Sequence, residues 1–301
     1  MEKDLFLADI PGANLWQSTE RITAGWSKDQ KFLITTKSGV EYLLRLSDQT
    51  AFEQEKEKYV AMQALDQFEL PLPRLLDMGY ANHGKHTYRL FSWMEGQEIN
   101  NVLPQLTIRK QYELGWQAGQ ILKQIHQIRP QQEGGPWGSY YHEKIDRKIA
   151  SFREGHFIFP KADNIIDFIE RHRKLLNGRP TTFLHGDFHI GNMLLTPENT
   201  LAIIDFNRLG FGDPWEEFNR INWTASVSEA FAKGQINGYF EEGIPAGFFE
   251  LMALYMATNQ IGAFAWAAAY GAKEVKTHHE QTLEVLDWYD DFQQVRPKWY
   301  D

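Results

Sequence analysis

Three oxygen-bearing side chains in one short stretch are the strongest candidates for chemistry. Asp187 and Asn192 lie in the segment H-G-D-F-H-I-G-N, and Asp205 follows in I-I-D-F. Two carboxylates and a carboxamide are hard oxygen ligands, which suit Mg²⁺ and leave coordination positions for phosphate oxygens. Phosphoryl transfer needs one aspartate to accept a hydroxyl proton, and an amide and a second aspartate to hold metal. The stretch therefore indicates phosphoryl-transfer chemistry.

A hairpin of two short strands is expected to position these side chains. Met193–Leu195 and Leu201–Ile204 are apolar runs, and the turn-forming residues T-P-E-N-T separate them. Asp187 and Asn192 lie on the loop that enters the first strand, and Asp205 ends the second. Such a hairpin would bring the three side chains close together.

Both motifs resemble those of a known family. H-G-D-F-H-I-G-N resembles the H-G-D-x-x-x-x-N catalytic loop of the aminoglycoside phosphotransferase and choline-kinase superfamily. The run from I-D-F to G-D-P-W resembles the metal-binding segment of that superfamily. The resemblance implies that Asp187 is the catalytic base and that Asn192 and Asp205 bind Mg²⁺. It also implies that Glu217, with Glu216 as the alternative, braces the catalytic loop.

The resemblance further implies an α+β, protein-kinase-like fold with two lobes. A small N-terminal lobe, residues 1–95, would be dominated by an antiparallel sheet and would bind the nucleotide. A larger, mainly helical lobe, residues 96–301, would carry the catalytic and substrate-binding residues.

Nucleotide-binding residues are implied for the first lobe. Arg45, in the strand E-Y-L-L-R-L, stands where the family has a phosphate-binding lysine. Arginine keeps the positive charge but differs in bulk and geometry. Glu55 is implied to pair with it, with Glu53 and Glu57 as alternatives. The other residues implied to bind the nucleotide are Ser27 and Lys28 over the phosphates, and Phe91, Ser92 and Met94 at the adenine.

The reaction implied is transfer of the γ-phosphoryl group of ATP or GTP to a hydroxyl of a small molecule. An aminoglycoside-type antibiotic is favoured as the acceptor, because the H-G-D and G-D-P-W motifs resemble that branch of the superfamily. A metabolite kinase, of the choline, homoserine, methylthioribose or sugar type, is the alternative. Two other classes stay open. One is a nucleotide-binding scaffold without transfer, since Arg45 replaces lysine, and the other is a zinc hydrolase that uses His185, Asp187, His189, His278 and His279.

Aromatic and acidic residues are frequent after Phe218. Aromatic faces and carboxylates suit a cationic ligand, but the same residues could equally form core and solvated surface. The aromatic residues are Trp215, Trp223, Phe264, Trp266, Trp288 and Tyr289, and the acids are Glu280, Glu284, Asp287, Asp290 and Asp291.

Composition restricts the remaining classes of function. The 301 residues are 43% hydrophobic and 24% charged, as in soluble globular proteins. Because there is no cysteine, disulfides and thiolate catalysis are excluded, which suits a cytoplasmic location. No signal peptide or membrane span is expected. The net charge of -9 argues against a nucleic-acid partner and is compatible with a cationic small substrate. No obligatory protein partner is evident.

Hydrophobic periodicity and turn residues predict the remaining elements. The predicted strands are 20–24, 31–36, 41–46, 75–80 and 86–93. The predicted helices are 50–65, 106–128, 141–154, 164–177, 219–232, 236–241, 246–270 and 275–294.

Overall fold

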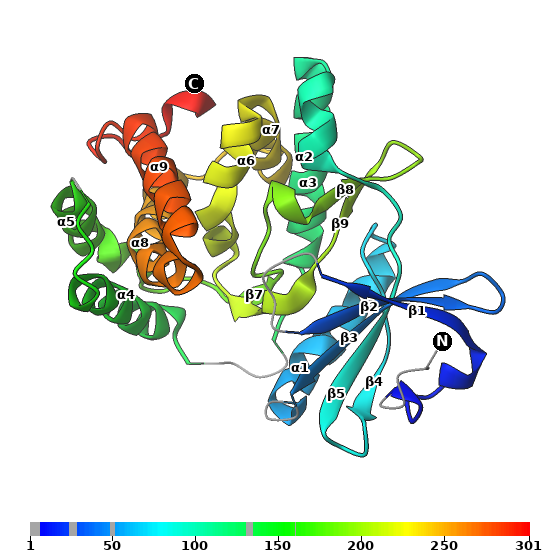
Figure 1. Cartoon of the computed structure of the whole chain (residues 1–301). Coiled ribbons are helices and arrows are strands. Elements are labelled where there is room, and N and C mark those ends of the chain that lie inside the picture. Colours follow the sequence, from blue (N-terminus) through cyan, green and yellow to red (C-terminus); the bar gives the residue numbers. More distant parts are fainter. Residues whose placement is uncertain (1–6, 24–28, 49–51, 131–134, 160) are drawn as a thin grey trace. The chain divides into compact units, whose positions relative to one another are not determined.

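The chain forms two compact units, which are described separately below. The structure is a computed structural model, and it describes residues 7–23, 29–48, 52–130, 135–159 and 161–301 (Figure 1). The first unit comprises Met1–Gln97 and Leu194–Ile204, and the second comprises Glu98–Met193 and Asp205–Asp301.

The first unit is built on a five-stranded antiparallel sheet. Its strand order is β1-β2-β3-β5-β4, so sequence neighbours pair except where β3 lies beside β5. The strands are β1 (Trp16–Ile22), β2 (Gln30–Thr36), β3 (Glu41–Asp48), β4 (Leu75–Ala81) and β5 (His86–Ser92), and helix α1 (Phe52–Gln63) follows β3.

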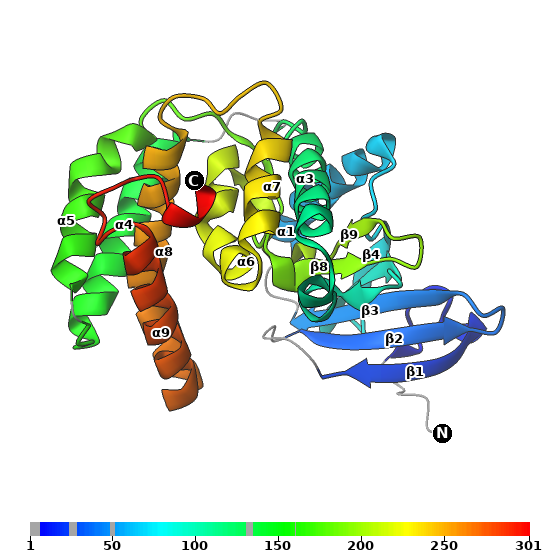
Figure 2. The ribbon, with the colours of Figure 1, turned by 90° about the horizontal axis from the view of Figure 1, so that it is seen from above.

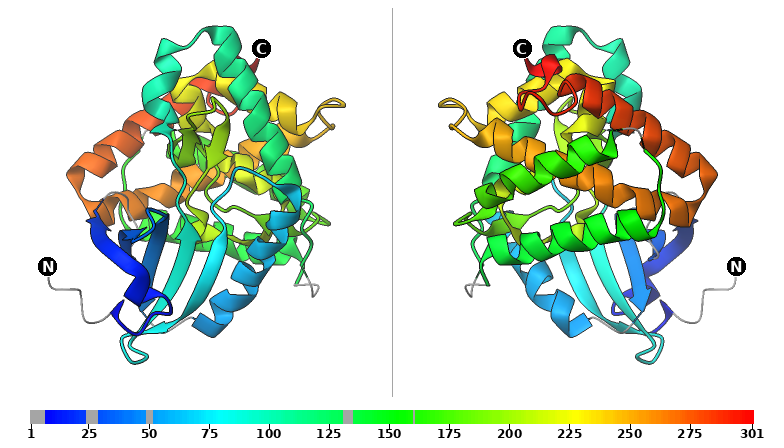
Figure 3. Two further views of the ribbon diagram at one scale, coloured as in Figure 1. Left: turned by 90° about the vertical axis from the view of Figure 1, so that its right-hand side faces the viewer. Right: turned by 90° about the vertical axis from the view of Figure 1, so that its left-hand side faces the viewer.

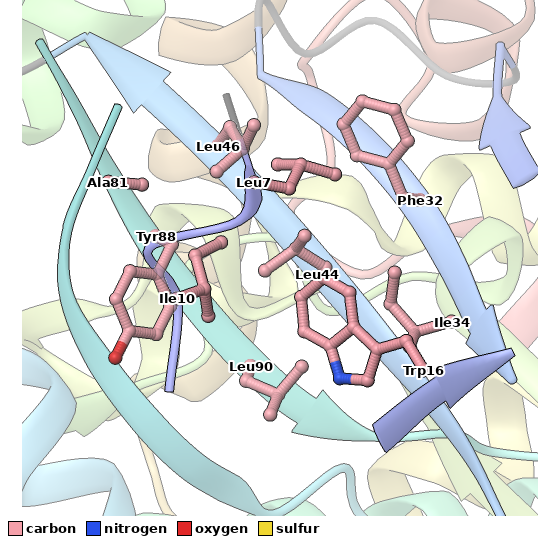
Figure 4. Packing of buried hydrophobic residues seen from close by; sticks show 10 residues of the cluster. All are labelled: Leu7, Ile10, Trp16, Phe32, Ile34, Leu44, Leu46, Ala81, Tyr88 and Leu90. Carbon is pink, nitrogen blue, oxygen red and sulfur yellow. The ribbon is translucent and has the colours of Figure 1, made fainter. Parts of the chain in front are cut away.

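Alternating side chains of the strands build the core of this unit. Leu44 and Leu46 of β3 are buried with residues from β2, β4 and β5 on one face of the sheet (Figure 4). Arg45, between them, must point to the opposite face, because successive strand residues alternate. The buried cluster consists of Leu7, Ile10, Trp16, Phe32, Ile34, Leu44, Leu46, Ala81, Tyr88 and Leu90.

The second unit is mainly helical. Its helices are α2 (Ile99–Val102), α3 (Ile108–Ile125), α4 (Trp137–Glu154), α5 (Ala162–His172), α6 (Ile221–Val227), α7 (Glu229–Tyr239), α8 (Phe248–Tyr270) and α9 (Ala272–Trp288). Together with the antiparallel sheet of the first unit, they confirm the α+β class with a small sheet-based part and a larger helical part.

Helices α3 and α7 touch along a seam of four glycines (Figure 2). A Cβ at Gly115 would overlap the carbonyl oxygen of Phe231, and one at Gly119 would overlap that of Gln235. From the other side, a Cβ at Gly234 or Gly238 would overlap carbonyl oxygens of α3. The spacing Gly-x-x-x-Gly on both helices places the glycines one turn apart on one face, so the two backbones approach closely. The sequence analysis did not identify this seam.

Helix α8 is buried among other helices. Helices α4 and α5 pack against it (Figure 3), and α9 follows after Gly271. None of the helices in the described ranges is long and apolar enough to cross a membrane.

The predicted element types are confirmed, with shifts at their ends. The largest difference lies in segment 219–241, where two helices, α6 and α7, meet at Ser228. The Ser228 hydroxyl accepts the Phe231 N–H at 3.0 Å, so it caps the start of α7. The predicted hairpin is present as β8 (Met193–Leu195) and β9 (Leu201–Ile203), in a sheet ordered β6-β8-β9 with β6 (Gln97–Glu98).

Candidate active site

A short strand pair in the second unit brings the two candidate motifs together. Strand β7 (Thr182–Leu184) pairs antiparallel with β10 (Gly210–Gly212), and Leu184 lies opposite Gly210. Residues that follow β7 and residues that precede β10 therefore lie at the same end of the pair. This end carries the loop of Asp187 and the loop that starts at Asp205. The sequence analysis did not predict β10.

Gly186 allows these two loops to touch. Its φ is +81°, a left-handed conformation that favours glycine, and a Cβ would overlap the carbonyl oxygen of Arg208. The glycine of H-G-D is therefore required by both conformation and space.

Glu217 holds the loop of Asp187 through two hydrogen bonds to its backbone. Its two carboxylate oxygens accept the backbone N–H groups of His185 at 2.9 Å and Gly186 at 2.8 Å. Burial, with the neighbouring charge of Glu216, raises the pKa of Glu217 to about 8, although the two N–H groups act in the opposite direction. Glu216 instead pairs with Lys144 at 2.9 Å. The predicted acidic brace of the loop is confirmed, and it is Glu217.

Asp187 lies among cationic side chains. Its Oδ1 is 3.1 Å from Arg220 Nη1, and its Oδ2 is 3.7 Å from Arg208 Nε. Burial acts to raise the pKa of Asp187, but the charge of Arg220, with His189 and Arg208, outweighs it and holds the pKa below its ordinary value. The carboxylate is therefore ionised at neutral pH, as an acceptor of a proton must be.

Asn192 is fixed to the same loop. Its Nδ2 donates to the backbone carbonyl of Asp187 at 2.9 Å. This bond directs the amide nitrogen to the loop, so Oδ1 is the atom that remains for a cation. It ends the short 3₁₀ helix η7 (Ile190–Asn192).

His189 is buried beside these residues. Its Nδ1 accepts the Gly191 N–H at 3.0 Å, and its ring packs edge-on against Trp223 at 4.7 Å between centroids. Burial lowers the pKa of His189 to about 4, so the ring is neutral at pH 7. It is thus a packed residue of the loop.

Asp205 has a left-handed backbone, with φ +67° and ψ +62°, and precedes the 3₁₀ helix η8 (Phe206–Arg208). Such conformations are costly for residues other than glycine, although Asp and Asn tolerate them best, and they concentrate at functional sites. The carboxylate is partly exposed. Asn192 and Asp205 thus supply an amide oxygen and a carboxylate, the donors that fit Mg²⁺.

Asp213 of G-D-P-W has a structural role. It is fully buried, accepts two bonds from the Arg179 guanidinium at 2.6 and 2.9 Å, and accepts the Tyr255 hydroxyl at 2.6 Å. Its side chain also caps η9 (Pro214–Arg220) through the Trp215 N–H. Helix η9 carries Glu217 and Arg220, so this network holds the residues that contact the catalytic loop.

In the first unit, Arg45 is buried and faces Asp29. Its Nε is 3.4 Å from Asp29 Oδ2, and the same oxygen is 3.1 Å from Arg89 Nη2. Arg89 lies opposite Arg45 in the β3–β5 register and donates to the Tyr59 hydroxyl at 2.7 Å. Two arginines thus share one aspartate, an arrangement that the sequence analysis missed. Glu55 lies in α1, and its side chain is outside the described residues, as are Ser27 and Lys28.

The residues predicted to contact adenine lie at the end of β5. Phe91 is buried, and its ring is 6.2 Å from that of Tyr59. The Ser92 N–H donates to the Arg74 carbonyl at 2.9 Å, and the Ser92 hydroxyl accepts the Arg74 N–H at 2.8 Å. Met94 follows β5 and is partly buried.

Most of the aromatic residues after Phe218, and Trp215 just before it, form core. Phe264, Trp288 and Tyr289 are buried, and Trp215 packs on Phe248 and under Arg179. Several of the acids have partners of their own: Asp291 pairs with Lys161, Asp287 with Lys298, and Glu284 accepts the Ser226 hydroxyl.

The histidines proposed for a zinc site are separated. His278 lies in α9, and its Nε2 is 2.9 Å from the Gln260 carbonyl of α8, whereas His185 is buried under the catalytic loop between Phe188 and Phe206. Within the part of the chain that the structure describes, no three His, Asp or Glu side chains form a group that could hold a metal.

Comparison of the sequence with family profiles gives a match that covers most of the chain. Residues 18–251 match the profile of the phosphotransferase enzyme family. The chain belongs to this family. It is accordingly a phosphotransferase, and the predicted family resemblance is confirmed. A search of curated proteins gives no significant match.

Solved structures share the fold of this phosphotransferase. A thermostable mutant of aminoglycoside phosphotransferase APH(4)-Ia has a TM-score of 0.65 at 18% identity, covering 90% of this chain and 94% of that one. The gentamicin complex of APH(2")-IIa gives 0.62 at 13%, covering 89% and 92%. Amicoumacin kinase hAmiN, in complex with AMP-PNP, Ca²⁺ and Ami, gives a TM-score of 0.64 at 12% identity, covering 92% of this chain and 90% of that one.

Proposed function

We propose that this phosphotransferase is a small-molecule kinase that transfers the γ-phosphoryl group of ATP to a hydroxyl. The observation that carries the proposal is the environment of Asp187. An ionised carboxylate lies on a loop held by Glu217, with the amide of Asn192 bonded to the same loop. The neighbouring structures with AMP-PNP support a nucleoside triphosphate as the donor.

In the proposed reaction, Asp187 positions the acceptor hydroxyl and takes its proton. The hydroxyl oxygen forms a bond to the γ-phosphorus as the bond from that phosphorus to the bridging oxygen breaks, and ADP leaves. Asn192 and Asp205 would hold Mg²⁺, which neutralises charge on the phosphates when bound. Arg45 would contribute positive charge to the nucleotide site, and Ser27, Lys28, Phe91, Ser92 and Met94 stay predicted nucleotide contacts.

The acceptor is the finer part of the proposal. The sequence analysis favours an aminoglycoside-type antibiotic, and the solved relatives include complexes with hygromycin B and gentamicin. Antibiotic resistance would follow from such an acceptor and is proposed with it, and the cytoplasmic location stays a prediction. A metabolite kinase is the second candidate. The cationic side chains around Asp187 favour metabolites without a positive charge, because these side chains would repel a cationic acceptor.

A coupled assay of nucleotide consumption tests the proposal. The full chain is incubated with ATP and Mg²⁺ against aminoglycosides, macrolides, choline, sugars and hydroxy acids. Asp187→Asn should reduce kcat for any accepted compound by about 10²- to 10⁴-fold, because only the proton acceptor is lost. The variant should still fold and bind nucleotide. Unchanged turnover in Asp187→Asn would refute the assigned mechanism, and nucleotide binding without transfer to any acceptor would favour the scaffold.

A further inference from the structure

Lys148 in α4 occupies space that a glycine of α8 leaves open. A Cβ at Gly262 would overlap Cδ and Cε of the Lys148 side chain and lie 2.7 Å from its Nζ. Helices α4 and α8 pack together here (Figure 3). Glycine is a poor residue for a helix interior, so its position in the middle of α8 is explained by the passage of this lysine. The Lys148 side chain is thereby partly buried.

The ammonium group of Lys148 is only weakly hydrogen-bonded to the described part of the protein. Its described hydrogen bond is to the Thr258 carbonyl, at a long 3.4 Å. The neighbouring carboxylate of Glu216 is already bound by Lys144 at 2.9 Å. Among the described residues no carboxylate pairs with Lys148, and a partly buried cation in that situation is unfavourable, because its hydration is reduced and no opposite charge replaces it.

Other cations make this position still less favourable for a charge. Burial, followed by the charge of Lys144, lowers the pKa of Lys148 to about 7; Glu216 opposes the shift, and Arg220 and Arg208 add to it. Arg220 and Arg208 are the two arginines that contact the Asp187 carboxylate. Lys148 lies one turn after Lys144 on the same face of α4, and Lys144 pairs with Glu216 of η9, the segment that also carries Arg220. The face of α4 that carries Lys148 therefore lies toward the segment that contacts the proposed base.

We propose that Lys148 binds an anionic group of the acceptor, a carboxylate or a phosphate, while a hydroxyl of the same molecule reaches Asp187. An anion at this position would supply an opposite charge, which no carboxylate in the described part of the chain provides by pairing with Lys148. A polycationic acceptor would add repulsion among Lys144, Lys148 and Arg208. The inference rests on the proposed kinase function and restricts its acceptor to anionic hydroxyl compounds.

Matched pairs of acceptors test the charge requirement. The full chain is assayed with ATP against gluconate and glucose, glycerate and glycerol, and glycerol 3-phosphate, with hygromycin B, gentamicin and choline as cationic compounds. The expected result is that kcat/KM for the anionic member of a pair exceeds that for its neutral partner by about tenfold or more, since charge-assisted hydrogen bonds are of that strength. Comparison of the carboxylates with glycerol 3-phosphate identifies which anion is bound.

Lys148→Met and Lys148→Gln then test the residue. Both should raise KM for the anionic acceptor by about tenfold and remove its advantage over the neutral partner, with KM for ATP unchanged. The matched control is Arg147→Met on the same helix, because Arg147 is exposed and paired with Glu143. Thermal unfolding of each variant checks that it folds. Two substitutions are used so that the residue is still tested if one of the variants does not fold.

The outcomes separate the inference from the function on which it rests. Equal or better transfer to neutral or cationic compounds would overturn the inference, as would an unchanged KM for the anionic acceptor in both Lys148 variants. A rise in KM for ATP would assign Lys148 to the nucleotide and overturn it as well. If no compound is phosphorylated, or if Asp187→Asn transfers as well as the unaltered chain, the kinase function itself fails.

Discussion

Asp187 and Arg220 form an ion pair in which Arg220 Nη1 lies 3.1 Å from the Oδ1 of Asp187. The same Nη1 donates to the carbonyl of Gly186 at 2.9 Å. One guanidinium therefore sets both the charge state of the carboxylate and the position of the loop that carries it.

Replacement of Arg220 by methionine should raise the pKa of Asp187. The arginine lowers that pKa now, and an adjacent arginine is worth about 1–3 pKa units. Since the ionised form accepts the proton, the acidic limb of the kcat/KM profile should move to higher pH by about one unit. The measurement is kcat/KM from about pH 3 to pH 8, because the pKa of Asp187 lies below its ordinary value and the acidic limb falls in that acidic range. Arg208→Met is the control, because Arg208 is 3.7 Å away and 54% exposed, and it should give a smaller movement. An unmoved limb in Arg220→Met would contradict the assignment of Asp187.

Replacement of Glu217 by glutamine should change how stability depends on pH. The pKa of Glu217 is raised to about 8 in the folded chain. At pH values between the ordinary pKa of a glutamate and 8, Glu217 therefore keeps its proton in the folded chain but has lost it in the unfolded chain. The free energy of unfolding should then fall as pH rises toward 8, by up to about 1.4 kcal/mol per pH unit. Glu217→Gln does not titrate and should lack this contribution.

Urea unfolding of both chains at pH 5.5 and pH 8 measures the effect. The advantage in free energy of unfolding of the unaltered chain over Glu217→Gln should fall by about 3 kcal/mol between pH 5.5 and pH 8, so that at pH 8 it disappears or reverses in sign. At pH 5.5 the variant should be less stable by about 1–3 kcal/mol, because the amide nitrogen cannot accept the second backbone N–H. A difference that is the same at both pH values would rule out the raised pKa.

Gly186→Ala should lower the stability of the fold more than the same substitution at a glycine that has free space around it. Its new Cβ would overlap the Arg208 carbonyl in addition to requiring a positive φ. Gly178 offers a matched control, since its φ is +70° and a Cβ there would meet nothing within 4 Å. Gly178→Ala should lose about 1 kcal/mol, whereas Gly186→Ala should lose several kcal/mol and nearly all transfer activity. Thermal unfolding and the coupled assay compare them, and equal losses would show that space at Gly186 is not limiting.

Asp205→Asn should weaken the binding of Mg²⁺, so that more Mg²⁺ is needed for activity. Asparagine tolerates the left-handed backbone as aspartate does, so the loop should keep its conformation while the site loses one negative charge. The Mg²⁺ concentration for half-maximal activity should rise by about tenfold or more. Asn207→Ala, two residues away, is the control. An unchanged Mg²⁺ dependence in Asp205→Asn would remove that residue from the proposed ligands.

The fold could be predicted to the level of its element types because the signals are local. Alternating apolar residues mark β3 and β5, and the apolar stripe from Leu114 to Ile125 marks α3. The break at Ser228 was missed, since one serine cap inside an otherwise helical pattern is a weak signal. The candidate site was predictable where residue order encodes it, as in H-G-D and G-D-P-W.

Features that depend on tertiary contacts could not be read from the sequence. The choice between Glu217 and Glu216 depends on which carboxylate faces the loop. The Asp29 carboxylate shared by Arg45 and Arg89 depends on strand register across β3 and β5. Lys148 and Gly262 are far apart in the chain, and each by itself is an ordinary residue in a helix.

The glycine seam between α3 and α7 has a consequence for how this enzyme can vary. Backbones in direct contact can neither slide nor rotate past one another without collision, so these two helices form a rigid pair. The segment η9 and α6, which anchors Arg220 and Glu217, leads directly into α7. Arg220 and Glu217, which contact the loop of Asp187, are thus connected through α6 to this rigid helix pair, so a substitution that separates α3 from α7 would also displace the carboxylate of Asp187.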